Sequence, residues 1–215
     1  SGTTHSPFHF FNDALSNCNR FDIGLGFFST ASINVLSIGF ANFIINGGRM
    51  RLYINQFLSE EDYRVIASSS PAEIDERILS DFNKLRATLS SRDEHFFKCL
   101  SYLISTNRVE IRIVIPKSGG IAHQKYGIFA DESGNKVAFN GSLNFTASAL
   151  LSKNIETISC STSWDGGEIQ VKEYERLFER FWNGEESDVI VYTADNFKKE
   201  VLRAFPPKDI EVLLR

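Results

Sequence analysis

The succession of strand and helix patterns between residues 21 and 54 constrains the fold more than any other feature of this sequence. Phe21–Phe28 is a short apolar run with glycines, typical of a buried strand that another segment approaches closely. Ala31–Ile45 is apolar at helical spacing and ends at Asn46–Gly48, a C-terminal helix signal. Met50–Ile54 then alternates like a second strand. Strand, helix and strand in succession predict a βαβ unit, and hence a pair of parallel strands.

The rest of the chain continues to alternate between helix and strand patterns. Further helices are predicted at Phe8–Asn17, Ser59–Ala67, Ala72–Leu89, Asp93–Ser105 and Glu168–Trp182, and further strands at Val109–Ile115, Ile121–Phe129, Lys136–Phe139 and Ile155–Cys160. Val189–Tyr192 and Asn196–Phe205 complete the pattern before Pro206 and Pro207. The expected fold class is α/β, with a mixed sheet flanked by helices on both faces. We expect one domain over residues 3–207. Residues 208–215 are expected to be a tail or the start of a linker to a further domain.

Composition and charge narrow the class of protein. The chain is 42% apolar and 23% charged, as in an ordinary globular domain, and no apolar run approaches the ~20 residues of a membrane span. The net charge of −4 is unevenly distributed: residues 1–160 carry 15 basic and 15 acidic side chains, and the remainder 8 and 12. Basic patches are therefore possible on a neutral body. Three widely spaced cysteines (Cys18, Cys99 and Cys160) predict reduced, buried thiols in a cytoplasmic protein.

Candidate catalytic residues lie in the segment from residue 121 to 156. His123 and Lys125 are two apart in a predicted strand, so both side chains leave the same face of the sheet. After a predicted hairpin turn come Gly141-Ser142-x-Asn144, and then Asn154-x-Glu156. Because the hairpin returns the chain beside the first strand, these polar side chains can converge on one small volume.

The residue types suit a phosphodiester. Lys125 supplies a positive charge, and the Ser142 hydroxyl and Asn144 amide supply neutral donors for the non-bridging oxygens. The His123 imidazole can attack phosphorus or transfer a proton, and Glu156 could fix its tautomer and orientation. The sequence shows no cluster of carboxylates with the spacing of a magnesium site, so we expect neither a metal nor another cofactor.

The three linked motifs resemble those of the phospholipase D superfamily, and most of all its nuclease branch in bacterial restriction enzymes and helicase-like defence proteins. The resemblance implies an α-β-α sandwich and a DNA endonuclease, and it offers a covalently linked helicase or motor domain as a partner. It also implies that His123 is the nucleophile of a phosphohistidine intermediate, while Lys125, Ser142 and Asn144 hold the phosphate.

Two departures from the family pattern have consequences. An Asp usually follows the Lys at a fixed distance, where this sequence has Ala130; Asp131 comes one residue later and is predicted to be a turn residue. A complete site in this family uses two His-x-Lys motifs, but His5, His9 and His95 have no Lys two residues on. The second half-site is therefore expected from another subunit, most simply in a twofold homodimer.

Several alternatives remain open from the sequence. The chain could be a lipid phosphodiesterase or phosphatidyl transferase of the same superfamily, or a catalytically weak module that binds DNA. The basic residues Arg49, Arg51, Arg112 and Lys117 could form a rim that tracks phosphates, or they could be ordinary solvated charges. Trp164 and Trp182 are expected in the core rather than as platforms for bases. The amphipathic helix Glu168–Trp182 is expected to pack on the sheet, with part of it free for a dimer interface.

Overall fold

A computed structural model of the chain describes residues 7–25, 39–54, 70–89, 91–117, 125–141 and 158–213. Its centre is a seven-stranded sheet with the strand order β6-β5-β4-β1-β2-β3-β7. The strands are β1 (Arg20–Leu25), β2 (Arg49–Ile54), β3 (Val109–Pro116), β4 (Lys125–Ala130), β5 (Lys136–Gly141), β6 (Ile158–Thr162) and β7 (Val189–Thr193).

The sheet is mixed, as predicted. The three central strands β1, β2 and β3 are parallel, which confirms the parallel pair expected from the βαβ pattern. The strands β4, β5 and β6 extend the sheet on one side as an antiparallel series, and β7 is antiparallel to β3 at the other edge. The predicted hairpin is therefore present as β4 and β5.

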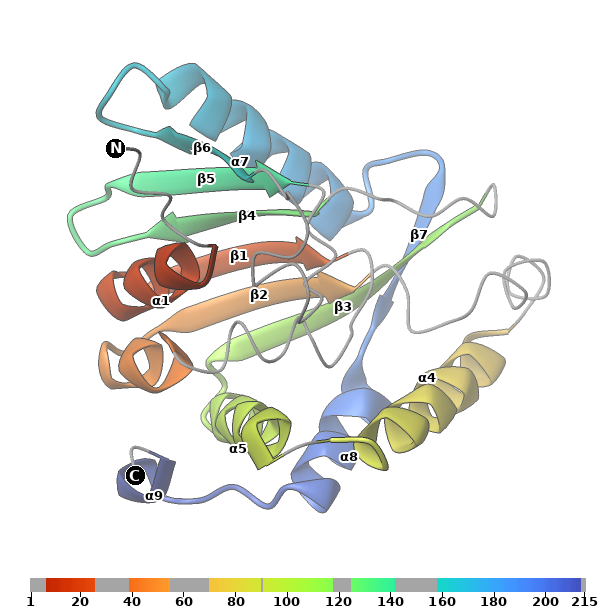
Figure 1. The fold of residues 1–215 in the computed structure, drawn as a ribbon. Helices are drawn as coiled ribbons and strands as arrows, with labels where there is room; N and C mark the ends of the chain where they lie inside the picture. The colour runs from red at the N-terminus through yellow and green to blue at the C-terminus, as the bar shows by residue number, and fades with distance from the viewer. Residues whose placement is uncertain are drawn as a thin grey trace.

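Helices cover both faces of the sheet (Figure 1). The helix α7 (Glu168–Asn183) packs on one face. The opposite face is covered by α1 (Pro7–Asn17), a helical segment over residues 39–45 and α5 (Ser91–Ser105). The helices α4 (Pro71–Arg86), α8 (Asp195–Ala204) and α9 (Ile210–Leu213) extend this core: α8 and α9 pack against α5, and α4 packs against α8. The predicted helix Ser59–Ala67 and the first part of Ala31–Ile45 lie outside the described residues.

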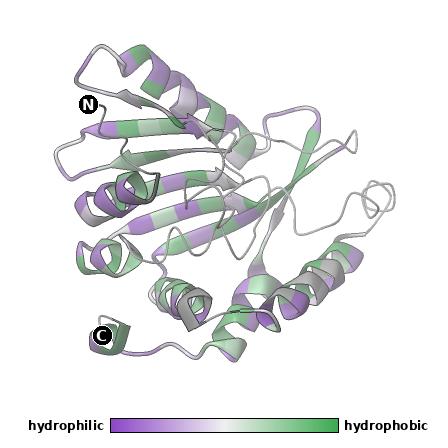
Figure 2. Cartoon of the chain, in the orientation of Figure 1, coloured by the Kyte–Doolittle hydropathy of each residue, from purple (hydrophilic) through white to green (hydrophobic). Residues whose placement is uncertain are grey.

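Alternation along the strands decides which face each side chain meets. In β2, Met50, Leu52 and Ile54 join the larger core with α1 and α5, whereas Tyr53 joins the smaller core under α7. The intervening Arg51 also points toward α7, where its guanidinium lies over the Phe178 ring. Figure 2 shows the corresponding alternation of hydrophobic and hydrophilic bands along the strands. This period of two is what the sequence pattern predicted.

Aromatic side chains fill the larger core. Phe21 stacks on Phe129 with ring centroids 4.3 Å apart, and Phe97 stacks on Phe205 at 5.2 Å. Trp182, on the inner face of α7, is buried, as predicted. Trp164 is 57% exposed in the turn after β6, so the core prediction is wrong for it. Cys18 and Cys99 are buried, whereas Cys160 is exposed on the edge strand β6 and departs from the prediction.

The packed core continues beyond Pro207. Leu213, in the short helix α9, is buried in the same cluster as α5 and α8. Residues 208–213 thus contribute a core contact to the domain that was predicted to span 3–207. Within the described part of the chain, no helix is both long and apolar enough to cross a membrane.

Candidate active site

The strands that flank the three motifs start or end at the same edge of the sheet. Lys125 is the first residue of β4, Gly141 is the last residue of β5, and Ile158 is the first residue of β6. The register pairs Lys125 with Gly141 and Gly141 with Ile158, so the three residues form one row across neighbouring strands. The three motif segments therefore join the sheet at adjacent positions, although up to 33 residues separate them in the chain.

The predicted site residues flank this row in the sequence. His123 precedes Lys125 by two residues, Ser142 follows Gly141 directly, and Glu156 precedes Ile158 by two. His123, Ser142, Asn144 and Glu156 lie outside the described residues, and of Lys125 only the backbone is described. Their roles remain predictions. The structure gives the strand frame from which these segments leave, which we call the site edge.

The site edge is also where the parallel strands end. Gly24 of β1 pairs with Tyr126 of β4, so the carboxyl end of β1 lies beside the start of β4. The carboxyl ends of β2 and β3 follow in the same direction, because both strands are parallel to β1. Ligands of open α/β sheets bind outside the carboxyl ends of parallel strands, in the crevice where the strand order reverses. The row Lys125–Gly141–Ile158, which we call the motif row, thus lies at the edge of the sheet where ligands of such folds bind.

Asp131 lies at the other end of the hairpin. Its carboxylate accepts hydrogen bonds from the backbone N–H and the side-chain amide of Asn135, both at 2.8 Å. The side-chain bond from Asn135 is the main cause that lowers the pKa of Asp131 below its ordinary value. Asp131 directly follows the last residue of β4, at the end of the strand away from Lys125, and its bonds to Asn135 span the turn to β5. The prediction that Asp131 is a turn residue is therefore confirmed.

Two buried tyrosines lie one residue behind the site edge, on the face under α7. Tyr126 and Tyr53 belong to β4 and β2, on either side of Gly24 in β1. Tyr53 lies directly over Gly24: a methyl group added there would lie 2.3 Å from the ring and hydroxyl of Tyr53. Burial raises the pKa of both phenols, so both stay protonated at neutral pH. The sequence did not predict this pair of buried tyrosines, although the alternation in β4 indicated that Tyr126 faces away from the larger core.

Arg51 serves an internal ion-pair network rather than a phosphate rim. Its guanidinium donates to both oxygens of Asp22, at 2.8 and 2.7 Å, and to Glu179 of α7 at 2.8 Å. The hydrogen bond to Asp22 is the main cause that raises the pKa of Arg51. Asp22 is 1% exposed and also contacts Arg20 at 3.3 Å. The network thus joins the middle of the sheet to α7.

The other basic residues of the predicted rim divide into two groups. Arg112 lies 4.3 Å over the Trp182 ring and donates to the Trp182 carbonyl, so it is also engaged with α7. Arg49 begins β2, at the edge opposite the site edge. Lys117 directly follows β3 at the site edge and is exposed, with its ammonium group 2.6 Å from the Ser187 carbonyl oxygen. Among these four residues, Lys117 is the one whose position suits a phosphate contact.

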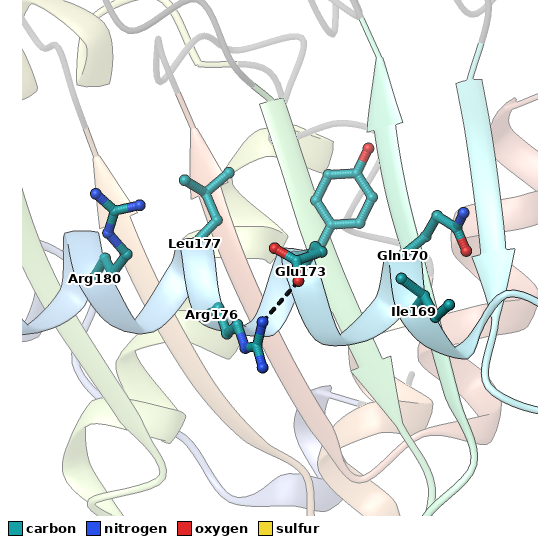
Figure 3. A pocket seen from close by; sticks show the side chains of 7 residues that line it. Ile169, Gln170, Glu173, Arg176, Leu177 and Arg180 are labelled. Atoms are coloured by element: carbon teal, nitrogen blue, oxygen red, sulfur yellow. Dashed lines mark hydrogen bonds and ion pairs between the residues drawn. The ribbon is translucent and has the colours of Figure 1, made fainter.

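A groove of about 650 Å³ runs along the outer flank of α7 (Figure 3). Within the part of the chain that the structure describes, its lining comes from α7: Ile169, Gln170, Glu173, Tyr174, Arg176, Leu177 and Arg180. The Tyr174 ring lies 5.8 Å from the ring of Tyr126, which follows Lys125 in β4. Tyr174 therefore lies near the start of β4, whereas the Ile169 end of the groove lies toward the opposite end of the strands. Among the described residues, no group of three or more His, Cys, Asp or Glu side chains could hold a metal ion.

The comparison with protein families agrees with the frame of the site. The family model described as "Cardiolipin synthase, PLD-like domain" matches residues 46–182, which is more than half of the chain. The match runs from just before β2 to the end of α7 and includes all three motifs. No curated protein matches the chain. The sheet, the position of the motifs and the family match together place this chain in the phospholipase D-like family, a family of phosphodiesterases.

Proposed function

We propose that this domain is a metal-independent nuclease, acting as a DNA endonuclease of a bacterial restriction or defence system. The observation that carries the proposal is the row Lys125–Gly141–Ile158. It anchors the flanks of all three motifs side by side, as a site made from His123, Lys125, Ser142, Asn144 and Glu156 requires. We also propose that this domain is covalently linked to a helicase or motor domain.

In the proposed mechanism, a ring nitrogen of His123 attacks phosphorus, and the bond from phosphorus to the leaving oxygen breaks as the phosphorus–nitrogen bond forms. Lys125, Ser142 and Asn144 bind the non-bridging oxygens and stabilise their charge in the transition state. Glu156 orients His123 through its second ring nitrogen.

The leaving oxygen needs a proton, which His123 of the partner subunit supplies as a general acid. Water then attacks the phosphohistidine and loses a proton to that second histidine, which restores both rings as the phosphorus–nitrogen bond breaks. Because the chain carries a single His-x-Lys motif, both steps require two subunits.

The direct test is cleavage of supercoiled plasmid DNA by the purified protein in EDTA. The wild-type protein should nick or linearise the plasmid, and His123→Ala should lower the rate by about a thousandfold or more. His9→Ala is the matched control, because His9 is an exposed residue of α1. Activity that appears only with added Mg²⁺ would contradict the metal-free mechanism. Binding of DNA by a dimer without cleavage would favour a targeting module.

A phospholipid substrate is the second candidate, because the matching family model carries the name of cardiolipin synthase. An enzyme that works on a lipid surface needs membrane contacts beside its site. In the described part of the chain, the exposed apolar side chains Trp164 and Ile169 flank the connection from the C-terminal end of β6 to α7, opposite the site edge. Turnover of phosphatidylglycerol or phosphatidylcholine vesicles, with no cleavage of DNA, would reverse the order of the two candidates.

A further inference from the structure

Two strands run past the site edge as a ribbon. Ile54, the last residue of β2, pairs with Ile113 of β3, and this pair lies level with the motif row. In the described ranges, residues 114–116 of β3 continue beyond that level and pair with residues 189–191 of β7. We call these two segments the projecting ribbon (Figure 1). Lys117 directly follows β3 and lies at the tip of the ribbon.

The projecting ribbon is held against the core under α7. Val114 is buried in that core, and Val189 and Val191 pack against the same cluster from β7. At the tip, the backbone N–H of Lys117 donates to the Asp188 carbonyl oxygen at 2.7 Å. Groups at the ends of paired strands are positioned more exactly than groups on loops. The ribbon can therefore present Lys117 at a fixed position.

The charge of Lys117 is available to a ligand. The residue is exposed, and its ammonium group donates to a neutral acceptor, the Ser187 carbonyl oxygen, at 2.6 Å. The carboxylates at positions 186 and 188 have other partners: Glu186 pairs with Arg180 at 2.9 Å, and Asp188 accepts from the Ser187 hydroxyl at 3.3 Å. An ammonium group with no carboxylate partner in the described part of the chain can bind a phosphate oxygen.

The distance from Lys117 to the motif row decides which substrates can reach both. Three strand spacings separate β4 from β3, or about 14 Å across the sheet, and four residues separate Ile113 from Lys117, or about 13 Å along it. The α-carbons of Lys117 and Lys125 are therefore about 20 Å apart. One phosphodiester, such as a phospholipid head group, cannot contact both residues. Duplex DNA carries a phosphate about every 3.4 Å along each strand, so a phosphate roughly six nucleotides away can.

We propose that Lys117 binds a backbone phosphate of a polynucleotide substrate, about 20 Å from the phosphodiester that is cleaved. This proposal rests on the nuclease function proposed above. It names the feature of the substrate that the projecting ribbon recognises, which is a polyanion long enough to reach from the motif row to the tip. Lys117 would strengthen binding without touching the reacting atoms.

Lys117→Gln tests the contact when it is introduced into His123→Ala protein, in which the DNA remains intact. Fluorescence anisotropy with a labelled DNA duplex of about 20 base pairs measures affinity between about 50 and 200 mM salt. Loss of one phosphate contact should weaken binding about fivefold to tenfold in 0.1 M salt and lower the slope of log K against log salt by about 1. Lys117→Arg should retain the wild-type affinity and slope.

Arg49→Gln is the matched control, because it removes one exposed positive charge at the opposite edge of the sheet. It should leave both the affinity and the slope unchanged. In the protein with His123 intact, Lys117→Gln should raise KM for plasmid DNA and change kcat by less than about twofold, since uniform binding is lost. Its turnover of bis(p-nitrophenyl) phosphate, which has a single phosphodiester, should equal that of wild type.

The outcomes separate this proposal from the proposed function. If Lys117→Gln binds DNA with the affinity and slope of the control, the Lys117 contact is overturned, while plasmid cleavage by the wild-type protein still supports the nuclease. DNA binding that depends on Lys117, without plasmid cleavage by wild type, would support the contact and contradict the nuclease. Slower turnover of bis(p-nitrophenyl) phosphate by Lys117→Gln would place Lys117 at the reacting phosphate and overturn the proposed distance. A wild-type protein that does not bind DNA would overturn both proposals.

Discussion

At the scale of single residues, the role of a charged side chain depends on the residues that it binds. Asp131 is predicted as a turn residue from its place in a polar stretch between two strands, and its bonds to Asn135 confirm this. Arg51 has an equally simple sequence environment, yet its partners Asp22 and Glu179 lie 29 and 128 residues away. The first role is local in the sequence, whereas the second exists only in the folded sheet.

Asp22 is the residue of this network whose loss should cost most stability. It is almost fully buried and binds both nitrogens of one edge of the Arg51 guanidinium. Asp22→Asn keeps the volume but removes the charge, which leaves Arg51 partly buried with a weaker partner. We expect the free energy of unfolding in urea to fall by about 3 kcal/mol.

Glu179→Gln is the comparison variant, since the Glu179 side chain is 46% exposed and binds the same guanidinium. Its cost should be roughly 1 kcal/mol or less because water screens the pair. Equal losses for the two variants would show that burial does not decide the strength of this network.

At the scale of elements, α7 is the helix whose structure the sequence predicted best and whose contacts it predicted least. Its bounds, Glu168–Asn183, differ by one residue from the expected range, because the amphipathic period is strong and Gly184 ends the helix in a left-handed conformation. The charged layer beneath it was not predictable from that period. The layer forms because α7 crosses strands whose inward side chains on this face include Asp22, Arg51 and Arg112.

The two tryptophans provide a test of how α7 docks. Trp182 is buried, stacks on Phe178 with ring centroids 5.5 Å apart, and lies under the guanidinium of Arg112. Trp182→Ala removes these contacts and should lower the free energy of unfolding by about 3–5 kcal/mol.

Trp164→Ala is a matched control, because it removes the same side chain from a position that is 57% exposed. We expect a change of roughly 0.5 kcal/mol in chemical denaturation. A loss at Trp164 as large as that at Trp182 would contradict the assignment of Trp182 as the anchor of α7.

At the scale of the whole molecule, the central prediction concerns assembly. A site shared by two subunits needs His123 from both, so a dimer with one His123→Ala subunit should be inactive. When wild-type and His123→Ala protein are mixed in equal amounts and allowed to exchange, about a quarter of the dimers contain two wild-type subunits. Plasmid cleavage should therefore fall to about a quarter of the wild-type rate at the same total protein concentration.

The contrasting result is simple to recognise. If each subunit acts alone, the mixture should cleave at half of the wild-type rate, in proportion to the wild-type chains present. The same mixture made with His9→Ala protein controls for dilution and exchange, and it should keep the full rate.

The sequence by itself determined the local features of this protein. The period of two in Met50–Ile54, the polar turn around Asp131 and the amphipathic face of α7 are each set by residue types within a short stretch, so that stretch is enough to predict them. The three motifs and their order are equally local, and with the family match they identify the class of chemistry.

The tertiary structure alone decided which distant segments meet. The strand order places β4 beside β1 and so brings the motif row to the carboxyl ends of the parallel strands. It also decided that Trp182 is buried while Trp164 is exposed, and that Arg51 is engaged by Asp22 and α7 rather than presented to a substrate. The physical reason is the same in each case. These outcomes depend on packing between residues far apart in the chain, and the pattern of a short stretch does not specify that packing.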